Sequence, residues 1–484
     1  MKRYGFLFGA GAEIAYNLPS GGRFALDIFR QNTTKPKEKF RQMRDKVDPL
    51  TSYAAGWLPQ GYKNNNISTY GKSVFQSIIN STVEHRRNQI IQNVNEIDKI
   101  AEGLDKDGTV KAAFLELIGK DIGNTHLSQI VEYNDNFSKG NKLFESSYFS
   151  GLMLAYKQTN EPFLKKIILS IMQLQLGALS EDLVRNISDN LFKKKDDTID
   201  IFDDFGDLIQ LNYSSAGVSG LELLLDGYQG ETVTPIGVIS VFAQSLVEEI
   251  YASVLDYKSL IDSNWHYLYN PRSDWAKFCK ISIFLLTVRE YIVQMGDNAD
   301  QFNPDGYYNM LRKAINDGLF ETTAIATTNY NKMIQDILAK DITYLNGSVS
   351  VWYDPYLNKI GSESELDTAE HHIIVPLIFT QSGTKPMTSI SMSMKYVDLY
   401  RAWKDSDAVV VVGFGFGADD EHINGILRTL VNDDGKELIV VTLSDTNADI
   451  ARKLKVENKN KIKVIQVDKT GHRNGKNWAE MLVS

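Results

Sequence analysis

Short apolar runs separated by helical patterns are the sequence feature that most constrains the fold. The first run, residues 4–8 (YGFLF), lies near the start of the chain, and the others come only after residue 320. Several are continuous β-branched runs, which are typical of parallel strands buried on both faces. The later runs are residues 322–330, 342–347, 371–379, 407–417, 437–445 and 461–468. Because helical patterns separate the later runs, the sequence predicts an α/β fold with a Rossmann-like, doubly wound parallel sheet.

The first run leads directly into a glycine-rich segment, residues 7–22 (LFGAGAEIAYNLPSGG). Strand, glycine-rich turn and helix follow one another there, which is the order that opens a doubly wound fold and receives the phosphates of a ligand. We therefore predict that Gly9, Ala10 and Gly11 hold a diphosphate. The alternative is a packing turn, because glycine also permits a close approach of two backbones.

The composition indicates a globular protein of a reducing compartment. With 484 residues, 43% of them hydrophobic, the chain can form two or three domains. The single cysteine, Cys279, excludes a disulfide framework and a cysteine-rich zinc module. A net charge of −9 argues against general nucleic-acid binding. Because no apolar stretch reaches the roughly 20 residues of a membrane helix and Glu13 interrupts the first apolar run, we expect a cytoplasmic protein without a membrane segment or a secretion signal.

The middle of the chain has a different pattern from its two ends. Apolar residues recur there at three- and four-residue spacing, as in residues 161–184 and 243–261, which indicates helices. We predict a discontinuous nucleotide-binding domain of residues 1–30 and 319–484. A helical domain of residues 31–318 would be inserted into it.

Four segments resemble, in order, the sirtuin-like NAD hydrolase domains of bacterial antiphage defence proteins. Residues 9–22 resemble the sirtuin opening motif, residues 326–334 (ATTNYNKMI) resemble its TQN segment, and residues 344–349 (YLNGSV) stand at its His-Gly element. Residues 409–424 (VVVVGFGFGADDEHIN) resemble the late strand and glycine-rich turn of the defence proteins. The resemblance implies that NAD is the substrate and that Pro19 of the opening motif lies at the cofactor. We expect no metal, because Cys279 stands alone and the histidines lack close metal-ligand spacing apart from His371 and His372.

Thr328 and Asn329 match positions of the family's TQN segment. Thr328 and Asn329 would lie at the carboxyl end of a parallel strand, where open α/β sheets place their ligands. The resemblance implies that Asn329 positions the nicotinamide ribose and the attacking water. The alternative is that Asn329 caps a helix that begins near Lys332. Asn331 replaces the acidic residue of the family.

Two residues depart from the family pattern. The family's general-base histidine is replaced by Asn346, and an amide cannot accept a proton near neutral pH. Either no base is needed or another group supplies it, and the candidate substitutes include the histidines His85, His126, His266, His371, His372, His422 and His472. Glu13 replaces a small hydroxyl residue. Since a carboxylate repels a diphosphate, Glu13 would face solvent or bind a ribose hydroxyl.

The late glycine-rich turn completes the predicted cofactor site. Gly413 and Gly415 follow four valines, so their backbone would lie at the carboxyl end of a strand, although such a turn can also simply end a buried strand. Asp445 ends a later run, where an acidic side chain can reach the adenosine ribose.

The predicted function is hydrolysis of NAD to nicotinamide and ADP-ribose by a defence effector that depletes NAD. Deacylation is the weaker enzymatic alternative, because one cysteine cannot supply the four-cysteine zinc ribbon of sirtuin deacylases. A sensor that binds NAD or an ADP-ribose derivative without cleaving it is the main rival, and a purely structural sheet is a third. We expect the helical insertion to restrain activity, and a second copy of the chain or a defence-system protein as partner.

Overall fold

The computed structural model describes residues 1–18, 21–122, 142–178, 198–200, 210–212, 221–252, 254–255, 258–378, 385–417 and 420–483. The chain forms two compact units. Unit 1 consists of residues 1–20, 31–70 and 258–484, and unit 2 consists of residues 21–30 and 71–257. The predicted domain boundaries at residues 30 and 319 stay a prediction.

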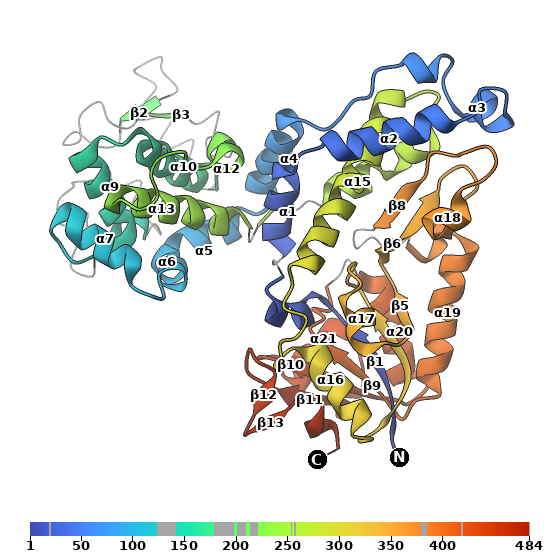
Figure 1. The fold of residues 1–484 in the computed structure, drawn as a ribbon. Coiled ribbons are helices and arrows are strands. Elements are labelled where there is room, and N and C mark those ends of the chain that lie inside the picture. Colours follow the sequence, from blue (N-terminus) through green and yellow to red (C-terminus); the bar gives the residue numbers. More distant parts are fainter. Residues whose placement is uncertain are drawn as a thin grey trace. The chain divides into compact units, whose positions relative to one another are not determined.

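Six strands among the described residues of unit 1 form one parallel sheet (Figure 1). In spatial order they are β11 (Ile462–Gln466), β10 (Glu437–Thr442), β9 (Ala408–Val412), β1 (Arg3–Phe8), β4 (Glu321–Thr327) and β5 (Ile342–Tyr344). When the six strands are numbered along the chain and read from β5 to β11, their order is 3-2-1-4-5-6, which is that of a Rossmann sheet. The strand order reverses between β1 and β9. The predicted doubly wound α/β fold is therefore confirmed.

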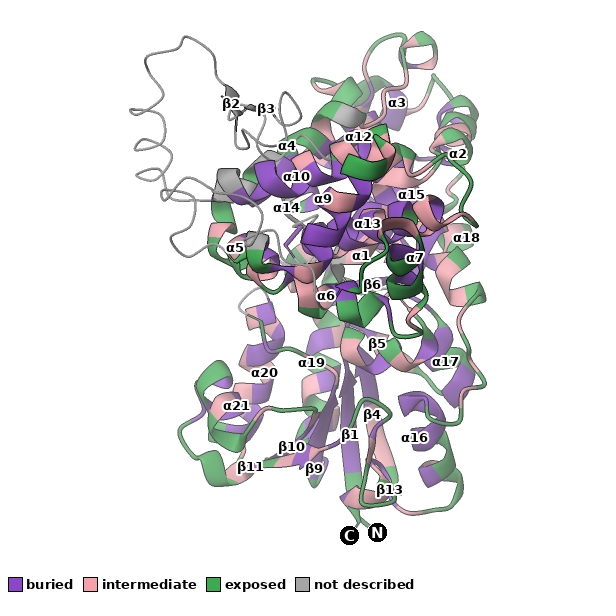
Figure 2. Ribbon diagram, turned by 90° about the vertical axis from the view of Figure 1, so that its left-hand side faces the viewer, coloured by how far each residue is buried: buried purple, intermediate pink, exposed green. Residues whose placement is uncertain are grey.

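Both faces of β1 are buried from Tyr4 to Phe8, which explains why this part of the strand is apolar (Figure 2). On one face, Tyr4, Phe6 and Phe8 share a core with α16 (Tyr307–Asn316). On the other face, Trp403 fills the space beside Gly5, where an added Cβ would lie 2.2 Å from the Cδ1 atom of the indole. A glycine is thus required in the middle of the strand.

The helices between the later strands lie where the sequence predicts them. They are α19 (Ile390–Lys404) before β9, α20 (Glu421–Asn432) after it, and α21 (Asn447–Leu454) after β10. The remaining helices of unit 1 are α2 (Thr34–Lys46), α3 (Ser52–Trp57), α14 (Lys258–Asn264), α15 (Trp275–Asp297), α17 (Met333–Leu338) and α18 (Glu363–Leu366).

The prediction that residues 371–379 belong to the parallel sheet is wrong. Their strand, β8 (Val375–Ile378), pairs antiparallel with β6 (Gly347–Asp354), which also pairs with β7 (Lys359–Gly361). An apolar run shows that a strand is buried but does not identify its partner, so the sequence pattern fits either sheet. Residues 379–384 of the following polar loop lie outside the described residues.

Unit 2 is built mainly from helices. They are α1 (Gly21–Arg30), α4 (Lys72–His85), α5 (Arg87–Asn95), α6 (Ile97–Leu104), α7 (Thr109–Ile118), α9 (Ser147–Thr159), α10 (Pro162–Ala178), α12 (Leu221–Asp226) and α13 (Pro235–Ala252). A short hairpin of β2 (Thr198–Asp200) and β3 (Gln210–Asn212) accompanies them. Among the residues that the structure describes, no helix is long and apolar enough to cross a membrane.

Candidate functional site

The carboxyl ends of β1 and β9 meet at the point where the strand order reverses, which is where Rossmann sheets bind their ligands. There the two glycine-rich turns pack backbone against backbone. Gly9 N–H donates to the Val412 carbonyl and Gly11 N–H donates to the Gly413 carbonyl, both at 2.9 Å. A Cβ on Gly9 would lie 2.5 Å from the Gly413 oxygen.

This close backbone contact explains why residues 9 and 11 are glycines: a side chain at either position would clash with the late turn. The amides of Gly9 and Gly11 are already engaged, so they are not available to cradle a diphosphate in this arrangement. Ala10, between them, is exposed. Gly415 has open space around it, and the next residue, Phe416, has a φ of 55°, which a bulky residue rarely adopts. The exposed part of the two turns, rather than their crossing point, is therefore the surface available to a ligand, while Pro19 lies outside the described residues.

Asn329 lies beside this crossing point, at the end of β4. Its Nδ2 donates to the Gly9 carbonyl at 3.1 Å and to the Tyr308 hydroxyl at 3.0 Å. Both amide hydrogens are thus used, which fixes the orientation of the side chain. Its Oδ1 remains as an acceptor with no protein partner among the described residues, and an amide oxygen held in this way can accept a hydrogen bond from a water or a ribose hydroxyl.

Glu13 is buried, with 7% of its surface exposed, so the alternative that it faces solvent is wrong. The Tyr308 hydroxyl donates to one carboxylate oxygen at 2.9 Å, and Asn331 Nδ2 donates to the other at 2.7 Å. Burial raises the pKa of Glu13 to about 7, although the hydrogen bonds from Tyr308 and Asn331 oppose this increase. A carboxyl group that changes its protonation state near neutral pH therefore lies one hydroxyl away from Asn329.

Tyr308 connects these groups and is itself held from its other side. It is fully buried on α16, and its ring stacks on that of Tyr16 at 5.4 Å between centroids. The Tyr16 hydroxyl accepts from the backbone N–H of Tyr308 at 2.8 Å. Burial and the nearby Glu13 raise the pKa of Tyr308 far above its ordinary value, so the hydroxyl keeps its proton. We call Glu13, Tyr308, Asn329 and Asn331 the Glu13 network.

The other residues at the end of β4 hold the backbone. Thr328 N–H donates to the Phe8 carbonyl at 2.9 Å, and Asn346 Nδ2 donates to the Thr328 carbonyl at 3.2 Å. The helix-cap alternative for Asn329 is wrong, because α17 begins at Met333 and it is Asn331 whose Oδ1 accepts from the Met333 N–H at 3.0 Å.

Asp445 and two of the candidate histidines form ion pairs with residues outside the Glu13 network. Asp445 forms an ion pair with Lys453 at 2.9 Å at the start of α21. Of the candidate histidines, His372 binds the buried Asp354 at 2.6 Å, and His371 binds Asp367 at 2.9 Å. His126 lies outside the described residues.

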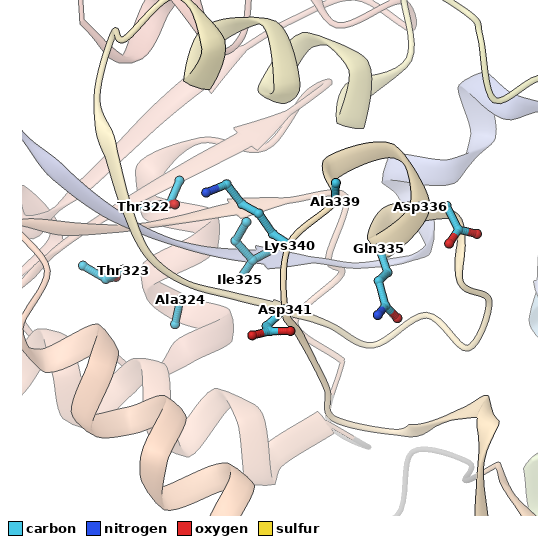
Figure 3. A pocket seen from close by; sticks show the side chains of 9 residues that line it. All are labelled: Thr322, Thr323, Ala324, Ile325, Gln335, Asp336, Ala339, Lys340 and Asp341. Atoms are coloured by element: carbon cyan, nitrogen blue, oxygen red, sulfur yellow. The ribbon is translucent and has the colours of Figure 1, made fainter. Parts of the chain in front are cut away.

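Described residues of unit 1 line three of its cavities. The largest of these three, about 780 Å³, follows the first half of β4 and is lined by Thr322, Thr323, Ala324, Ile325, Gln335, Asp336, Ala339, Lys340 and Asp341 (Figure 3). Its β4 residues precede the carboxyl end of the strand, so it does not lie where Rossmann sheets bind ligands. The other two, of about 570 and 260 Å³, share Arg289 and Lys332, and the smaller one is also lined by Asn331 of the Glu13 network.

The described part of the chain contains no group of three or more His, Cys, Asp or Glu side chains that is arranged to hold a metal ion. The prediction that the protein uses no metal stays a prediction.

Comparison with known proteins gives similarity to solved structures alone. No family model matches the sequence, and no curated protein matches it. A solved structure from a study of the mechanism and regulation of Sir2 enzymes aligns with 43% of this chain and 82% of its own, at 14% sequence identity and a TM-score of 0.24. The fold class rests on the sheet order described above.

Sequence reasoning missed Tyr308, which joins Glu13 to Asn329. It lies on a helix 21 residues before Asn329 in a run of ordinary amphipathic pattern. No motif marks a tyrosine whose hydroxyl acts only through tertiary contacts. The one available signal was Glu13 itself, since a carboxylate in an apolar segment needs donors when it is buried.

Proposed function

We propose that unit 1 hydrolyses NAD to nicotinamide and ADP-ribose and that the protein is an antiphage defence effector that depletes NAD. The observation that carries the proposal is the Glu13 network beside the Gly9 turn, which holds an oriented amide acceptor at the reversal point of a Rossmann sheet. The order of the sirtuin-like segments along the sequence supports NAD as the substrate.

The chemistry of this hydrolysis makes modest demands on the protein. The bond between the ribose anomeric carbon and the nicotinamide nitrogen breaks, its electron pair leaves with neutral nicotinamide, and the oxygen of a water molecule bonds to the anomeric carbon. Positive charge develops on the ribose, and fixed acceptors and negative groups stabilise such charge. In the proposal Asn329 Oδ1 orients the water or a ribose hydroxyl. Ionised Glu13, which is hydrogen-bonded to Tyr308, supplies negative charge that stabilises the positive charge on the ribose.

Asn346 does not supply the proton acceptor. An amide cannot take a proton near neutral pH, and this one donates to the Thr328 carbonyl. The released proton therefore goes to bulk water or to Glu13, whose pKa of about 7 suits proton exchange near neutrality.

The direct test is incubation of the purified protein with NAD, with nicotinamide and ADP-ribose quantified by chromatography. We expect equal amounts of the two products. Absence of nicotinamide release, at all protein concentrations and between pH 6 and 9, would contradict the proposed hydrolysis.

The alternative is a sensor that binds NAD or an ADP-ribose derivative without cleaving it. The replacement of the family histidine by Asn346 is the observation in its favour. Saturable binding of ADP-ribose by a protein that releases no nicotinamide would support the sensor instead.

A further inference from the structure

Arg289, on α15, is a partly buried cation. Burial lowers the pKa of its guanidinium. Its Nε donates to the Val349 carbonyl at 2.7 Å, and its central carbon lies 5.1 Å from the centre of the Trp352 ring. These two contacts fix the plane of the guanidinium. Across the described chain, no carboxylate lies within ion-pair distance of Arg289.

The two carboxylates that act on Arg289 from a longer distance are engaged elsewhere. Glu290 forms an ion pair with Lys35 at 3.8 Å, and Glu363 forms one with Lys39. Charged groups that lose water are normally paired or hydrogen-bonded. The two terminal nitrogens of Arg289 therefore remain available for a planar, bidentate contact with an oxyanion.

Two further cations face the same space. Lys332, directly before α17, lines both the 570 Å³ and the 260 Å³ cavity together with Arg289, and Lys46 of α2 lines the larger one. Both lysines are exposed and make no ion pair with any described residue. Three cations of one cavity thus have no acidic partner among the described residues.

The acidic side chains of the larger cavity do not offset this charge. Asp367 binds His371 at 2.9 Å, and Glu363 binds Lys39. His372 is paired with Asp354 and Glu370, so it is not counted as an additional cation. In the smaller cavity, the exposed carboxylates Asp297 and Asp336 form no ion pair with Arg289 or Lys332 across the described residues.

We propose that Arg289, Lys332 and Lys46 bind the phosphoryl group of a small phosphate-bearing molecule in the larger cavity. Arg289 supplies a bidentate contact, and the two lysines supply charge. The site contains no residue of the two glycine-rich turns, and it does not depend on NAD hydrolysis. It adjoins the Glu13 network through Asn331, which lines the smaller cavity and binds Glu13.

The test is isothermal titration calorimetry of the full chain with inorganic phosphate and, separately, with ADP-ribose at one fixed ionic strength. We expect saturable binding of at least one probe. Arg289→Met should weaken it about 10- to 100-fold and Lys332→Met about 3- to 10-fold, because each removes a charge-assisted contact. Lys340→Met is the matched control, since Lys340 is an exposed lysine of the separate cavity in Figure 3, and it should bind like the wild type.

The outcomes separate the sources of the phosphoryl group and the two proposals. Binding of inorganic phosphate that competes with ADP-ribose indicates a site for any phosphoryl group, and binding of ADP-ribose alone indicates a nucleotide. No binding of either probe at millimolar concentration, or binding that neither variant weakens, overturns the proposal. ADP-ribose bound at the glycine-rich turns would persist in both variants. If Arg289→Met does not fold, Lys332→Met decides, because its side chain is exposed.

Discussion

Asn329 and Asn346 are both buried asparagines, but their hydrogen bonds give them different roles. Asn329 donates both amide hydrogens, to the Gly9 carbonyl and the Tyr308 hydroxyl, so its oxygen is the group that can accept from a ligand. Asn346 donates to the Thr328 carbonyl. We expect Asn329→Ala to reduce NAD cleavage about 10²- to 10³-fold with little change in NAD affinity, because contacts made chiefly in the transition state affect rate. Rates of nicotinamide release and calorimetric NAD binding measure the two effects.

Asn346→Ala is the matched control. It also removes a buried amide, so the two variants should lose similar stability, but it should retain much more activity. Full activity of a folded Asn329→Ala variant would show that the active-site assignment is wrong although the fold is right.

Glu13 makes stability depend on pH. Its pKa in the folded protein is about 7, against 4.5 for an ordinary glutamate, so between these values the folded chain binds more protons than the unfolded chain. The contribution of Glu13 is therefore fully present below pH 4.5 and is lost as pH rises through 7. The difference between the two limits is about 3 kcal/mol.

Glu13→Gln should remove this dependence, because an amide does not titrate. It should also cost about 1 kcal/mol at low pH, since Tyr308 and Asn331 donate to different carboxylate oxygens and the amide replaces one of these acceptors with an NH₂ donor. Urea unfolding at pH 5 and pH 8 measures both effects. Equal changes of stability with pH in the variant and the wild type would contradict a neutral-range pKa for Glu13.

The crossing of the two glycine-rich turns distinguishes a packing glycine from a ligand-facing one. Gly413 has a φ of 65°, and an added Cβ would lie 2.2 Å from the Ala12 nitrogen, whereas Gly415 has nothing within 4 Å. We expect Gly413→Ala to destabilise the protein by about 2 kcal/mol or more, because it adds backbone strain and a clash. Gly415→Ala should leave thermal unfolding nearly unchanged.

Measuring NAD binding by the same two variants tests whether the late turn also receives the ligand. If the exposed part of the late turn receives the ligand, Gly415→Ala should weaken NAD binding without loss of stability. A Gly413→Ala variant as stable as the wild type would contradict the close backbone packing.

The strands of the parallel sheet were predictable because burial on both faces demands apolar residues along the whole strand. The run at residues 371–379 shows the limit of this signal, since β8 is equally apolar but pairs antiparallel with β6. β6 itself was missed, although its alternation of small and apolar residues fits a strand. Pairing partners depend on the path of the chain and not on the composition of one strand.

The candidate site was predictable only where residues follow strands directly. Gly9 and Asn329 were found because they come just after β1 and β4. Tyr308 and Arg289 come from helices that contact the site through tertiary packing, and neither stands in a recognisable motif. Glu13 was noticed in the sequence, but its burial depends on Tyr308 and Asn331, which lie about 300 residues further along the chain.

The chain leaves unit 1 immediately after its first glycine-rich turn. Residues 1–20 belong to unit 1, but α1, which follows them, belongs to unit 2. There the buried Glu248 of α13 pairs with Arg23 and Arg30 of α1, both at 2.5 Å. These ion pairs and the Arg30 hydrogen bond keep the carboxylate charged, and they lower its pKa against the opposing effect of burial. The packing of α1 in unit 2 is therefore covalently linked to the turn that carries Gly9 and Glu13.

Because of this linkage, the expectation that the helical segment restrains activity can be tested with a substitution in unit 2. Glu248→Gln removes the negative charge that holds two arginines of α1, and breaking a buried pair costs about 3–5 kcal/mol. We expect a lower thermal transition of unit 2 and a faster release of nicotinamide, since the first turn would be less constrained. Glu249→Gln, with the same charge change at the next, half-buried position, should alter neither. If Glu248→Gln lowers the transition while the rate of nicotinamide release stays that of the wild type, α1 does not restrain the active site, and the helical segment needs another role.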